Sequence, residues 1–244
     1  MDLVVRAPNK PLKGQTVLGS QFAQYPGGKG ANQAVQIARL GAKAYMVGRV
    51  GNDSFGRDLL DNLKQAGVLV DYVCRDEQAG TGLACIFTNA AGDNWIVVVP
   101  QANMHCTKED IEKAKSVIVT SSMLVAQLEI PLSVVAYAID MASDHRIPVL
   151  LNPAPAQEIP RAVLKKVNIL VPNETEAEAL TGTRITDLES AKIAARILLE
   201  MGPEKVIITM GEKGSLLATH DEMMLVPSWK VDAIDTTAAG DAFC

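Results

Sequence analysis

The sequence predicts an α/β fold built on a parallel, Rossmann-like sheet, and three observations carry this prediction. From about residue 123 onward, short apolar runs alternate with amphipathic helical patterns, and such alternation indicates right-handed βαβ units. The segment "TGLACIFTNAAGDNWIVVV" departs from this rhythm, because two β-like runs flank an Asn/Gly/Asp turn. Of the 244 residues, 48% are hydrophobic and 21% charged, which is typical of one globular domain. We therefore expect a three-layer sandwich of sheet and helices, together with a small β-layer.

The first part of the chain predicts two helices and a strand between them. The stretch "KGANQAVQIARL" places small residues three and four apart on one face, and Gly41 follows as a stop. "AYMVGRV" predicts a buried strand, and "DSFGRDLLDNLKQAG" predicts a helix that begins after Asp53 as N-cap and ends at Gly67. The opening "DLVVRA", residues 14–25 and the hairpin near 81–99 form the β-layer, which is a candidate lid over about 3–26 and 80–103 of a single domain 1–244.

The second part predicts strands and helices in strict alternation. Strands are expected at "SMLVAQLE", "IPVLLN", "VNILVPN" and "KVIITMG", and helices at "PLSVVAYAIDMAS", "ETEAEALTG" and "ITDLESAKIAARILLEMG". Ligands of such sheets bind beyond the carboxyl ends of the strands. The residues that follow each strand are therefore the candidates for a functional site.

Composition argues against several classes of partner. The net charge is −5 and no stretch concentrates Lys and Arg, so we expect no nucleic-acid partner and no membrane partner. Four scattered cysteines without a CxxC pair indicate a reduced protein, and three histidines without metal-ligand spacing are expected to be structural or on the surface. No apolar run reaches about 18 residues and no signal peptide is recognisable. We expect a cytoplasmic protein, with the nucleus as a further possibility.

Two glycines before a predicted helix form the first candidate site, in "YPGGKGANQA". Glycines allow close approach of the backbone to a ligand, and a helix N-terminus offers N–H groups that have no partner within the helix. The segment is neither a dinucleotide GxGxxG motif nor a Walker A motif. A tight turn with no ligand is the alternative.

Three further candidates follow predicted strands. Glu129 in "QLEIP" is a candidate ligand contact or simply a surface carboxylate. In "VPNETEAE", Asn173 and Glu176 could hold a hydrated Mg²⁺, although an acidic first turn also compensates the helix dipole. In "ITMGEKG", Gly211 and Gly214 bracket either a plain hairpin or a loop that lies over a nucleotide.

The closing "DTTAAGD" is the strongest local signal. Small residues let successive N–H groups converge, and the dipole of the following helix adds positive potential. Asp241 would begin that helix beside the anion-binding turn, which suits a carboxylate that takes a proton from an attacking hydroxyl. A simple N-cap is the alternative role of Asp241.

These segments together resemble the ribokinase-like carbohydrate kinases. "GGKGANQAVQIARLGAKAYMVGRVGNDSFG" resembles the first signature of that family and "DTTAAGDAF" the second, in the right order and across essentially the whole chain. "QLE", "LNPAPA" and "PNETEAE" are similar to the ribokinase branch more than to the fructokinase or adenosine kinase branches. The resemblance implies the ribokinase-like fold and transfer of the γ-phosphoryl group of ATP to the 5-hydroxyl of D-ribose.

The resemblance also implies roles for individual residues. Asp241 would be the catalytic base, with an anion hole at the backbone of Ala238, Ala239 and Gly240. The sugar contacts would be Asp2, Gly27, Gly28, Lys29, Gly30, Asn32, Glu129 and Asp241. The ATP contacts would be Asn173, Thr209, Met210, Gly211, Glu212, Lys213, Gly214, Gly240 and Asp241. Glu176 would act on Mg²⁺ through water, and Asp235 and Thr237 on an activating K⁺.

Three departures and two alternatives accompany the resemblance. Ala238 stands where the family commonly has glycine, the family's first strand before Asp2 is missing, and so is everything after Cys244, so we expect a chain truncated at both ends. A lid that also forms a homodimer contact is implied. The alternatives are another sugar or nucleoside kinase of the family and a catalytically inactive product that only binds ligand.

Overall fold

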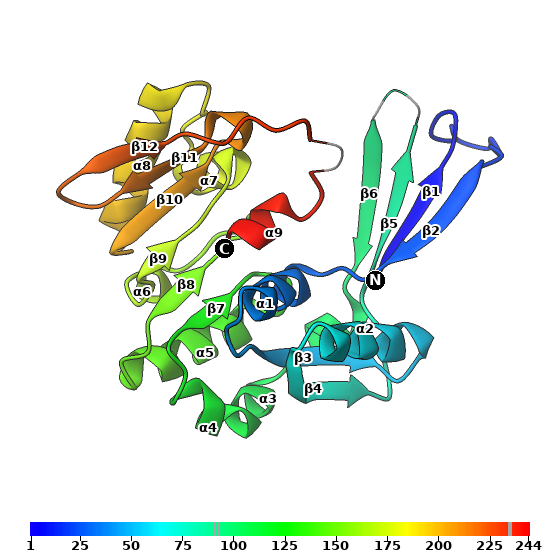
Figure 1. The fold of residues 1–244 in the computed structure, drawn as a ribbon, viewed down its shortest axis with the longest axis horizontal. Helices are drawn as coiled ribbons and strands as arrows, with labels where there is room; N and C mark the ends of the chain where they lie inside the picture. The colour runs from blue at the N-terminus through cyan, green and yellow to red at the C-terminus, as the bar shows by residue number, and fades with distance from the viewer. Residues whose placement is uncertain (90, 92, 234–235) are drawn as a thin grey trace. The chain divides into compact units, whose positions relative to one another are not determined.

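The computed structural model describes every residue of the chain except 90, 92, 234 and 235. Contacts divide the chain into two compact units, Met1–Cys106 and Thr107–Cys244, and each is described by itself. Both units combine helices with β-sheet (Figure 1). The expected single domain with a lid over about 3–26 and 80–103 stays a prediction.

The first unit contains a four-stranded sheet in the order β2-β1-β5-β6 and a separate pair, β3-β4. Strand β1 runs parallel to β5, whereas β1–β2 and β5–β6 are antiparallel. The predicted hairpin is therefore present, and residues 90 and 92 of its turn lie outside the described part. The bounds are β1 (Asp2–Arg6), β2 (Gln21–Tyr25), α1 (Lys29–Arg39), β3 (Tyr45–Gly51), α2 (Ser54–Gln65), β4 (Leu69–Asp76), β5 (Leu83–Thr88), β6 (Asn94–Val99) and the 3-10 helix η1 (Gln101–His105).

Both predicted helices of this unit are confirmed together with their end signals. Asp53 is the N-cap of α2, and its carboxylate accepts a hydrogen bond of 2.8 Å from the Gly56 N–H. Gly41 and Gly67, which follow α1 and α2, have φ of 88° and 85°, and glycine adopts this left-handed conformation without a steric penalty. Strand β4 was not predicted. It pairs in parallel with β3.

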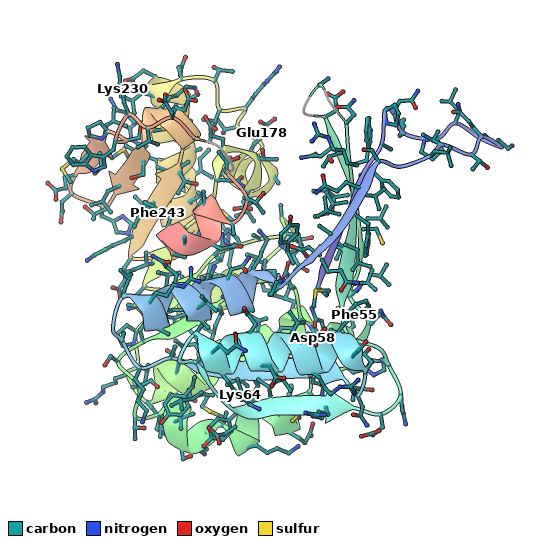
Figure 2. All side chains as sticks on the ribbon, turned by 45° about the vertical axis from the view of Figure 1, so that its right-hand side comes forward. Phe55, Asp58, Lys64, Glu178, Lys230 and Phe243 are labelled. Carbon is teal, nitrogen blue, oxygen red and sulfur yellow. The ribbon has the colours of Figure 1, made fainter. Side chains whose placement is uncertain are left out.

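The apolar face of α2 packs against the beginning of the chain. Met1, Val50, Leu59 and Leu60 form one buried cluster, and Phe55 packs against it from the first turn of α2. Figure 2 shows Phe55 at the N-terminal end of α2, next to the four-stranded sheet. Asp58 and Lys64 follow farther along the same helix. The start of β1 is thus fixed to α2 by apolar burial.

The second unit contains a six-stranded sheet in the order β12-β11-β10-β9-β8-β7. Strands β7 to β10 are parallel, as predicted, and β11 and β12 add an antiparallel edge. The bounds are α3 (Lys108–Lys113), α4 (Lys115–Ile118), β7 (Leu124–Ala126), α5 (Leu132–Asp144), β8 (Val149–Leu151), α6 (Arg161–Leu164), β9 (Ile169–Leu170), α7 (Glu174–Thr181), α8 (Leu188–Met201), β10 (Lys205–Thr209), the 3-10 turn η2 (Gly211–Lys213), β11 (Ser215–Ala218), β12 (Met223–Val226) and α9 (Ala239–Phe243).

The core of the second unit lies between this sheet and its helices. The side chains of Leu151, Leu170, Ile208 and Leu198 are fully buried, three of them on strands and one on α8. Figure 1 shows α8 behind strands β10 to β12 and α9 to the right of them. In the part of the chain that the structure describes, no helix has the length and apolar character needed to cross a membrane.

Candidate active site

The structure brings Asp2 and Gly27 into direct contact. Asp2 begins β1 and pairs with Ala84 on one side and Tyr25 on the other. A Cβ atom added to Gly27 would lie 2.3 Å from one carboxylate oxygen of Asp2 and 2.6 Å from the other. Only a residue without a side chain therefore allows the Asp2 carboxylate to rest against the backbone at residue 27.

The remaining sugar-side candidates of the first unit form the beginning of α1. Gly28 is the N-cap residue, with φ 103° and ψ 126°, which is a conformation that favours glycine. Lys29 and Gly30 begin the helix, and the Asn32 N–H donates to the Gly28 carbonyl at 2.9 Å. The first turn of α1 contains no acidic residue. The amide side chain of Asn32 and the N-terminus of α1 thus follow closely on Gly27, against which the Asp2 carboxylate packs. This combination suits the binding of hydroxyl groups.

In the second unit, Asn173 and Glu176 form a reciprocal helix cap at the start of α7. The Asn173 side chain accepts from the Glu176 N–H at 2.8 Å. The Glu176 carboxylate accepts from the Asn173 N–H at 2.9 Å and from its side-chain amide at 3.0 Å. Glu176 is 8% exposed. This geometry is a capping box, which was not predicted from the sequence. The acidic first turn also fits the alternative of dipole compensation.

The same cap decides how a magnesium ion would fit. Both carboxylate oxygens of Glu176 already accept hydrogen bonds. Among the residues that the structure describes, no group of three or more His, Cys, Asp or Glu could hold a metal ion. Contact between Glu176 and a magnesium ion through water is compatible with this cap, because Mg²⁺ commonly keeps several of its waters.

The nucleotide candidates Thr209 to Gly214 form the turn between β10 and β11. Asn173 and Thr209 are paired by a parallel bridge, so the structure brings the end of β10 next to the α7 cap. The Met210 N–H donates to the Gly214 carbonyl at 2.8 Å, and the flanking strands β10 and β11 are antiparallel. The segment therefore has the geometry of a hairpin, which is compatible with both alternatives. A role in nucleotide binding stays a prediction.

Lys213 in the β10–β11 turn and Glu129 after β7 are two further candidates in the second unit. The Lys213 ammonium lies 3.7 Å from the Glu174 carboxylate and donates to the Thr186 carbonyl at 3.3 Å. Glu129 is half-buried after β7, in a loop held where the Leu128 N–H donates to the Ala154 carbonyl at 2.8 Å. The described contacts thus favour neither the sugar role of Glu129 nor a surface role.

The closing signature folds as a left-handed residue followed by a short helix. Ala238 has φ 59° and ψ 11° and precedes α9. A left-handed residue followed by right-handed ones turns successive N–H groups toward one point. A Cβ atom at Gly240 would meet no atom within 4 Å outside its own helix, so the backbone there is open to a ligand. Asp241 is 7% exposed in the first turn. Thr237 is exposed, and Asp235 lies outside the described residues.

Comparison with known proteins identifies the family of the chain. Residues 1–244 match the family described as pfkB family carbohydrate kinase. The chain belongs to the pfkB family of carbohydrate kinases. It is 42% identical over 245 residues to the ribokinase of Mus musculus, with 99% of this chain and 76% of the relative covered.

This carbohydrate kinase is also similar to a relative with a different name. It is 40% identical over 244 residues to the deoxyribokinase of Salmonella typhi, with all of this chain and 80% of the relative covered. The solved structure of the Arabidopsis thaliana ribokinase complexed with ribose and ATP has a TM-score of 0.91 and 31% identity, covering 99% of this chain and 80% of that one. The fold is thus the α/β fold of the ribokinases, as the sequence predicted.

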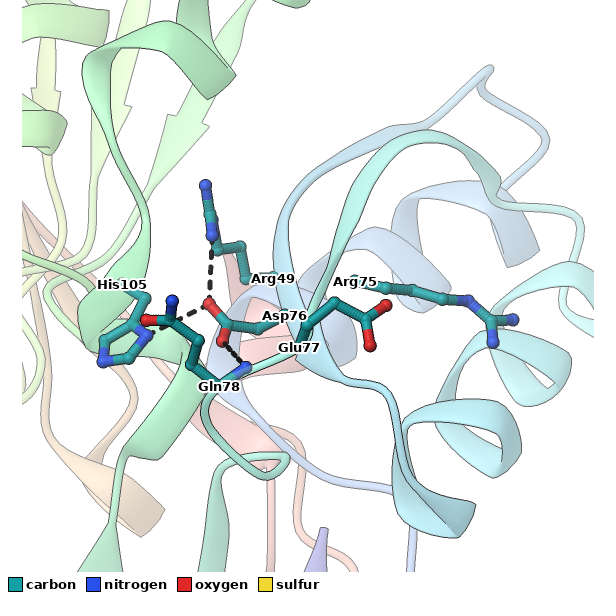
Figure 3. A pocket seen from close by; sticks show the side chains of 6 residues that line it. All are labelled: Arg49, Arg75, Asp76, Glu77, Gln78 and His105. Carbon is teal, nitrogen blue, oxygen red and sulfur yellow. Dashed lines mark hydrogen bonds and ion pairs between the residues drawn. The ribbon is translucent and has the colours of Figure 1, made fainter.

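The kinase has a side-chain cluster around Asp76 that the sequence did not reveal. Asp76, at the end of β4, accepts hydrogen bonds from Arg49 at 3.0 Å and from the Gln78 and Ala79 N–H groups, and lies 3.1 Å from a ring nitrogen of His105 (Figure 3). The pKa of the Asp76 carboxyl is held well below its usual range. The largest cause is the pair of hydrogen bonds from the Ala79 and Gln78 N–H groups, and Arg49 and His105 add to it. No local sequence motif predicted this cluster, because Arg49 and His105 are 27 and 29 residues away from Asp76 in the sequence.

Proposed function

We propose that this kinase transfers the γ-phosphoryl group of ATP to the 5-hydroxyl of D-ribose, giving ribose 5-phosphate and ADP. The observation that carries the proposal is the likeness, over almost the whole chain, to a ribokinase solved with ribose and ATP. The placement of Asp2 against Gly27, next to the start of α1, supports it, because a carboxylate beside a glycine-lined turn suits the hydroxyl groups of a sugar.

The proposed roles follow the chemistry of phosphoryl transfer. Asp241 accepts the proton of the attacking hydroxyl, and the N–H groups of Ala238 to Gly240 hold the charge that develops on the phosphoryl group. Asp2, the start of α1 and Glu129 orient the sugar. The α7 cap and the β10–β11 turn bind ATP. Positioning and electrostatic stabilisation account for most of the catalysis in such reactions.

Further parts of the proposal concern ions and assembly. Mg²⁺ would neutralise phosphate charge near Glu176, with water between, and K⁺ would bind at Asp235 and Thr237. A homodimer through the four-stranded sheet is supported by exposed apolar side chains along β6, namely Ile96, Val97, Val98 and Val99. We further propose that the protein acts in the cytoplasm.

Phosphorylation of 2-deoxy-D-ribose is the second candidate function. The 40% identity to a deoxyribokinase over the whole chain favours it. The two sugars differ in one hydroxyl group. A site that hydrogen-bonds the 2-hydroxyl would discriminate between them, because binding 2-deoxyribose leaves its polar groups without partners.

A coupled ADP-release assay with several sugars tests the proposal. We expect turnover with ribose, a higher kcat/KM for ribose than for 2-deoxyribose, and little turnover with fructose or adenosine, all dependent on Mg²⁺ and stimulated by K⁺. Asp241→Asn should lower kcat about 10²–10⁴-fold with little change in ribose affinity, which calorimetry measures.

The pattern of failures is informative. A preference for 2-deoxyribose would establish the second candidate in place of the first. Turnover of fructose or adenosine alone would assign another branch of the family. Ribose binding without any turnover, in the presence of both ions, would leave a ligand-binding protein. Near-normal turnover of Asp241→Asn would remove that residue from the role of base.

A further inference from the structure

The four-stranded sheet of the first unit is joined to α2 by a compact hydrogen-bond cluster around Thr81. Asp53, the N-cap of α2, accepts from the Thr81 hydroxyl at 2.6 Å through one carboxylate oxygen and from the Thr81 N–H at 2.7 Å through the other. The Thr81 hydroxyl in turn accepts from the Gly51 N–H at 2.9 Å. The Thr81 carbonyl accepts from the Gln101 side chain at 2.9 Å. Every polar atom of Thr81 is therefore bonded, and the residue is 2% exposed.

Three glycines make this close packing possible. A Cβ atom on Gly51 would lie 2.4 Å from the Thr81 nitrogen, and one on Gly56 would lie 2.2 Å from the Gly51 carbonyl oxygen. A Cβ atom on Gly80 would lie 2.6 Å from the side-chain oxygen of Gln101. Real Cβ contacts are not this short. Gly51 and Gly56 meet backbone atoms, so the end of β3, the start of α2 and the segment before β5 fit together only with glycine at these two positions, whereas at Gly80 the Gln101 side chain would have to move.

The cluster fixes the position of Asp2 through two backbone hydrogen bonds. The Gly82 carbonyl, next to Thr81, accepts from the Met1 nitrogen at 3.0 Å, and the Met1 carbonyl accepts from the Ala84 N–H at 2.9 Å. Asp2 is the strand partner of Ala84. A shift of Thr81 would therefore move the backbone against which Asp2 is paired.

Asp76 fixes the other end of the same connection. It binds the Gln78 and Ala79 N–H groups and is itself held by Arg49 of β3 (Figure 3). The segment from residue 76 to 81 is thus anchored by one carboxylate at each end. We propose that Asp53 and Thr81 are positioning residues for sugar binding, which act by holding the β1–β5 pair so that the Asp2 carboxylate meets the sugar. This proposal rests on the proposed function.

Sugar kinetics of variants in the full chain test the proposal. Thr81→Val keeps the shape of the side chain but removes the hydroxyl, and Thr81→Ser keeps the hydroxyl. We expect Thr81→Val to raise the KM for ribose about tenfold or more, because small displacements at a binding site are costly, while the KM for ATP stays within about twofold. Thr81→Ser should restore most of the ribose affinity. Thr88→Val, at the far end of β5, is the matched control and should leave both KM values unchanged.

Two outcomes would overturn the proposal. The first is a folded Thr81→Val protein with normal ribose KM. The second is an equal loss of ribose and ATP affinity that follows the loss of melting temperature, which a purely structural role predicts. If Thr81→Val does not fold, Asp53→Asn is tested by the same criteria. Its amide places an N–H₂ donor where one carboxylate oxygen was, either against the Thr81 N–H or against the Thr81 hydroxyl. In both orientations one of the two hydrogen bonds from Thr81 is lost.

Hydrogen exchange separates this proposal from the proposed function. If the wild-type protein does not phosphorylate ribose, the proposed function fails, but the amides of β1 and β5 still report on the cluster. Faster exchange of these amides in Thr81→Val than in Thr88→Val supports the positioning role. Equal exchange in the two variants overturns it, whatever the substrate.

Discussion

At the scale of single residues, the contact between Asp2 and Gly27 is the most informative feature of the first unit. The two are far apart in sequence, yet the Asp2 carboxylate occupies the space that a side chain at residue 27 would fill. The carboxylate is the end of a flexible side chain, so a small intruding group would displace it without disturbing the strand that carries it. Function and folding are therefore separable at this position.

We expect Gly27→Ala to weaken ribose binding while sparing stability. The added methyl group displaces the Asp2 carboxylate and should raise the KM for ribose about tenfold or more, with the melting temperature within a few degrees of wild type. Steady-state kinetics and thermal melting measure the two effects. Gly41→Ala is the control: a Cβ there would meet no neighbour, although the φ of 88° strains it, so it should cost stability rather than ribose affinity. The reverse pattern would contradict the assignment.

Ala238 shows how a signature residue can carry strain. A left-handed conformation costs roughly 1 kcal/mol or more for a residue with a Cβ atom, and Ala238 adopts it at φ 59°. Such strain persists where the surroundings impose it, often at functional sites. The conformation also sets the direction of the N–H groups that follow, so it supports the predicted anion hole at Ala238 to Gly240.

At the scale of elements, two carboxylates of the first unit are held in their charged form: Asp53 at the N-terminus of α2 and Asp76 at the end of β4. Burial of the Asp53 carboxyl opposes its ionisation, but hydrogen bonds from Thr81 and Gly56 and the charge of Arg57 outweigh burial and lower its pKa. The pKa of Asp76 is lowered as well, first by the Ala79 and Gln78 N–H groups. Both groups therefore favour the folded state only while they are ionised.

The pH dependence of stability follows from the direction of these shifts. An Asp in the unfolded chain titrates near about 3.9, so the stabilisation is complete above that pH and is lost as pH falls through the lower folded values. We expect the free energy of unfolding, measured by urea denaturation from pH 7 to pH 3, to decline once the pH falls to about 4. Asp76→Asn should flatten the decline. Asp58→Asn, on the exposed face of α2 (Figure 2), should not, and an equal effect of the two would contradict the interpretation.

The elements predicted from the sequence are those whose signals are local. The helices α1 and α2, the Asp53 cap and the β5–β6 hairpin each depend on residues within one short segment. Strands β7 to β9 have only two or three residues each, shorter than their apolar runs, because pairing with neighbouring strands decides where a parallel strand ends. The Thr81 cluster was not predicted, since its partner Asp53 is 28 residues away.

At the scale of the whole molecule, the predicted ligand contacts are divided between the two units. Asp2 and the start of α1 belong to Met1–Cys106, whereas the α7 cap, the β10–β11 turn and Asp241 belong to Thr107–Cys244. Each unit has its own sheet and its own buried core. A ligand that binds mainly to one unit should therefore protect the backbone of that unit first.

Hydrogen exchange with single ligands tests this division. Ribose alone should slow exchange of amides in β1 and the first turn of α1, because the predicted contacts of that unit are with the sugar. ADP alone should slow exchange at the start of α7 and at residues 209–214, and should leave β1 unchanged. L-Ribose, the mirror image of the sugar, is the control and should protect neither unit. Protection of β1 by ADP alone would assign the nucleotide to the first unit, and protection by ribose confined to the second unit would remove Asp2 from the sugar site.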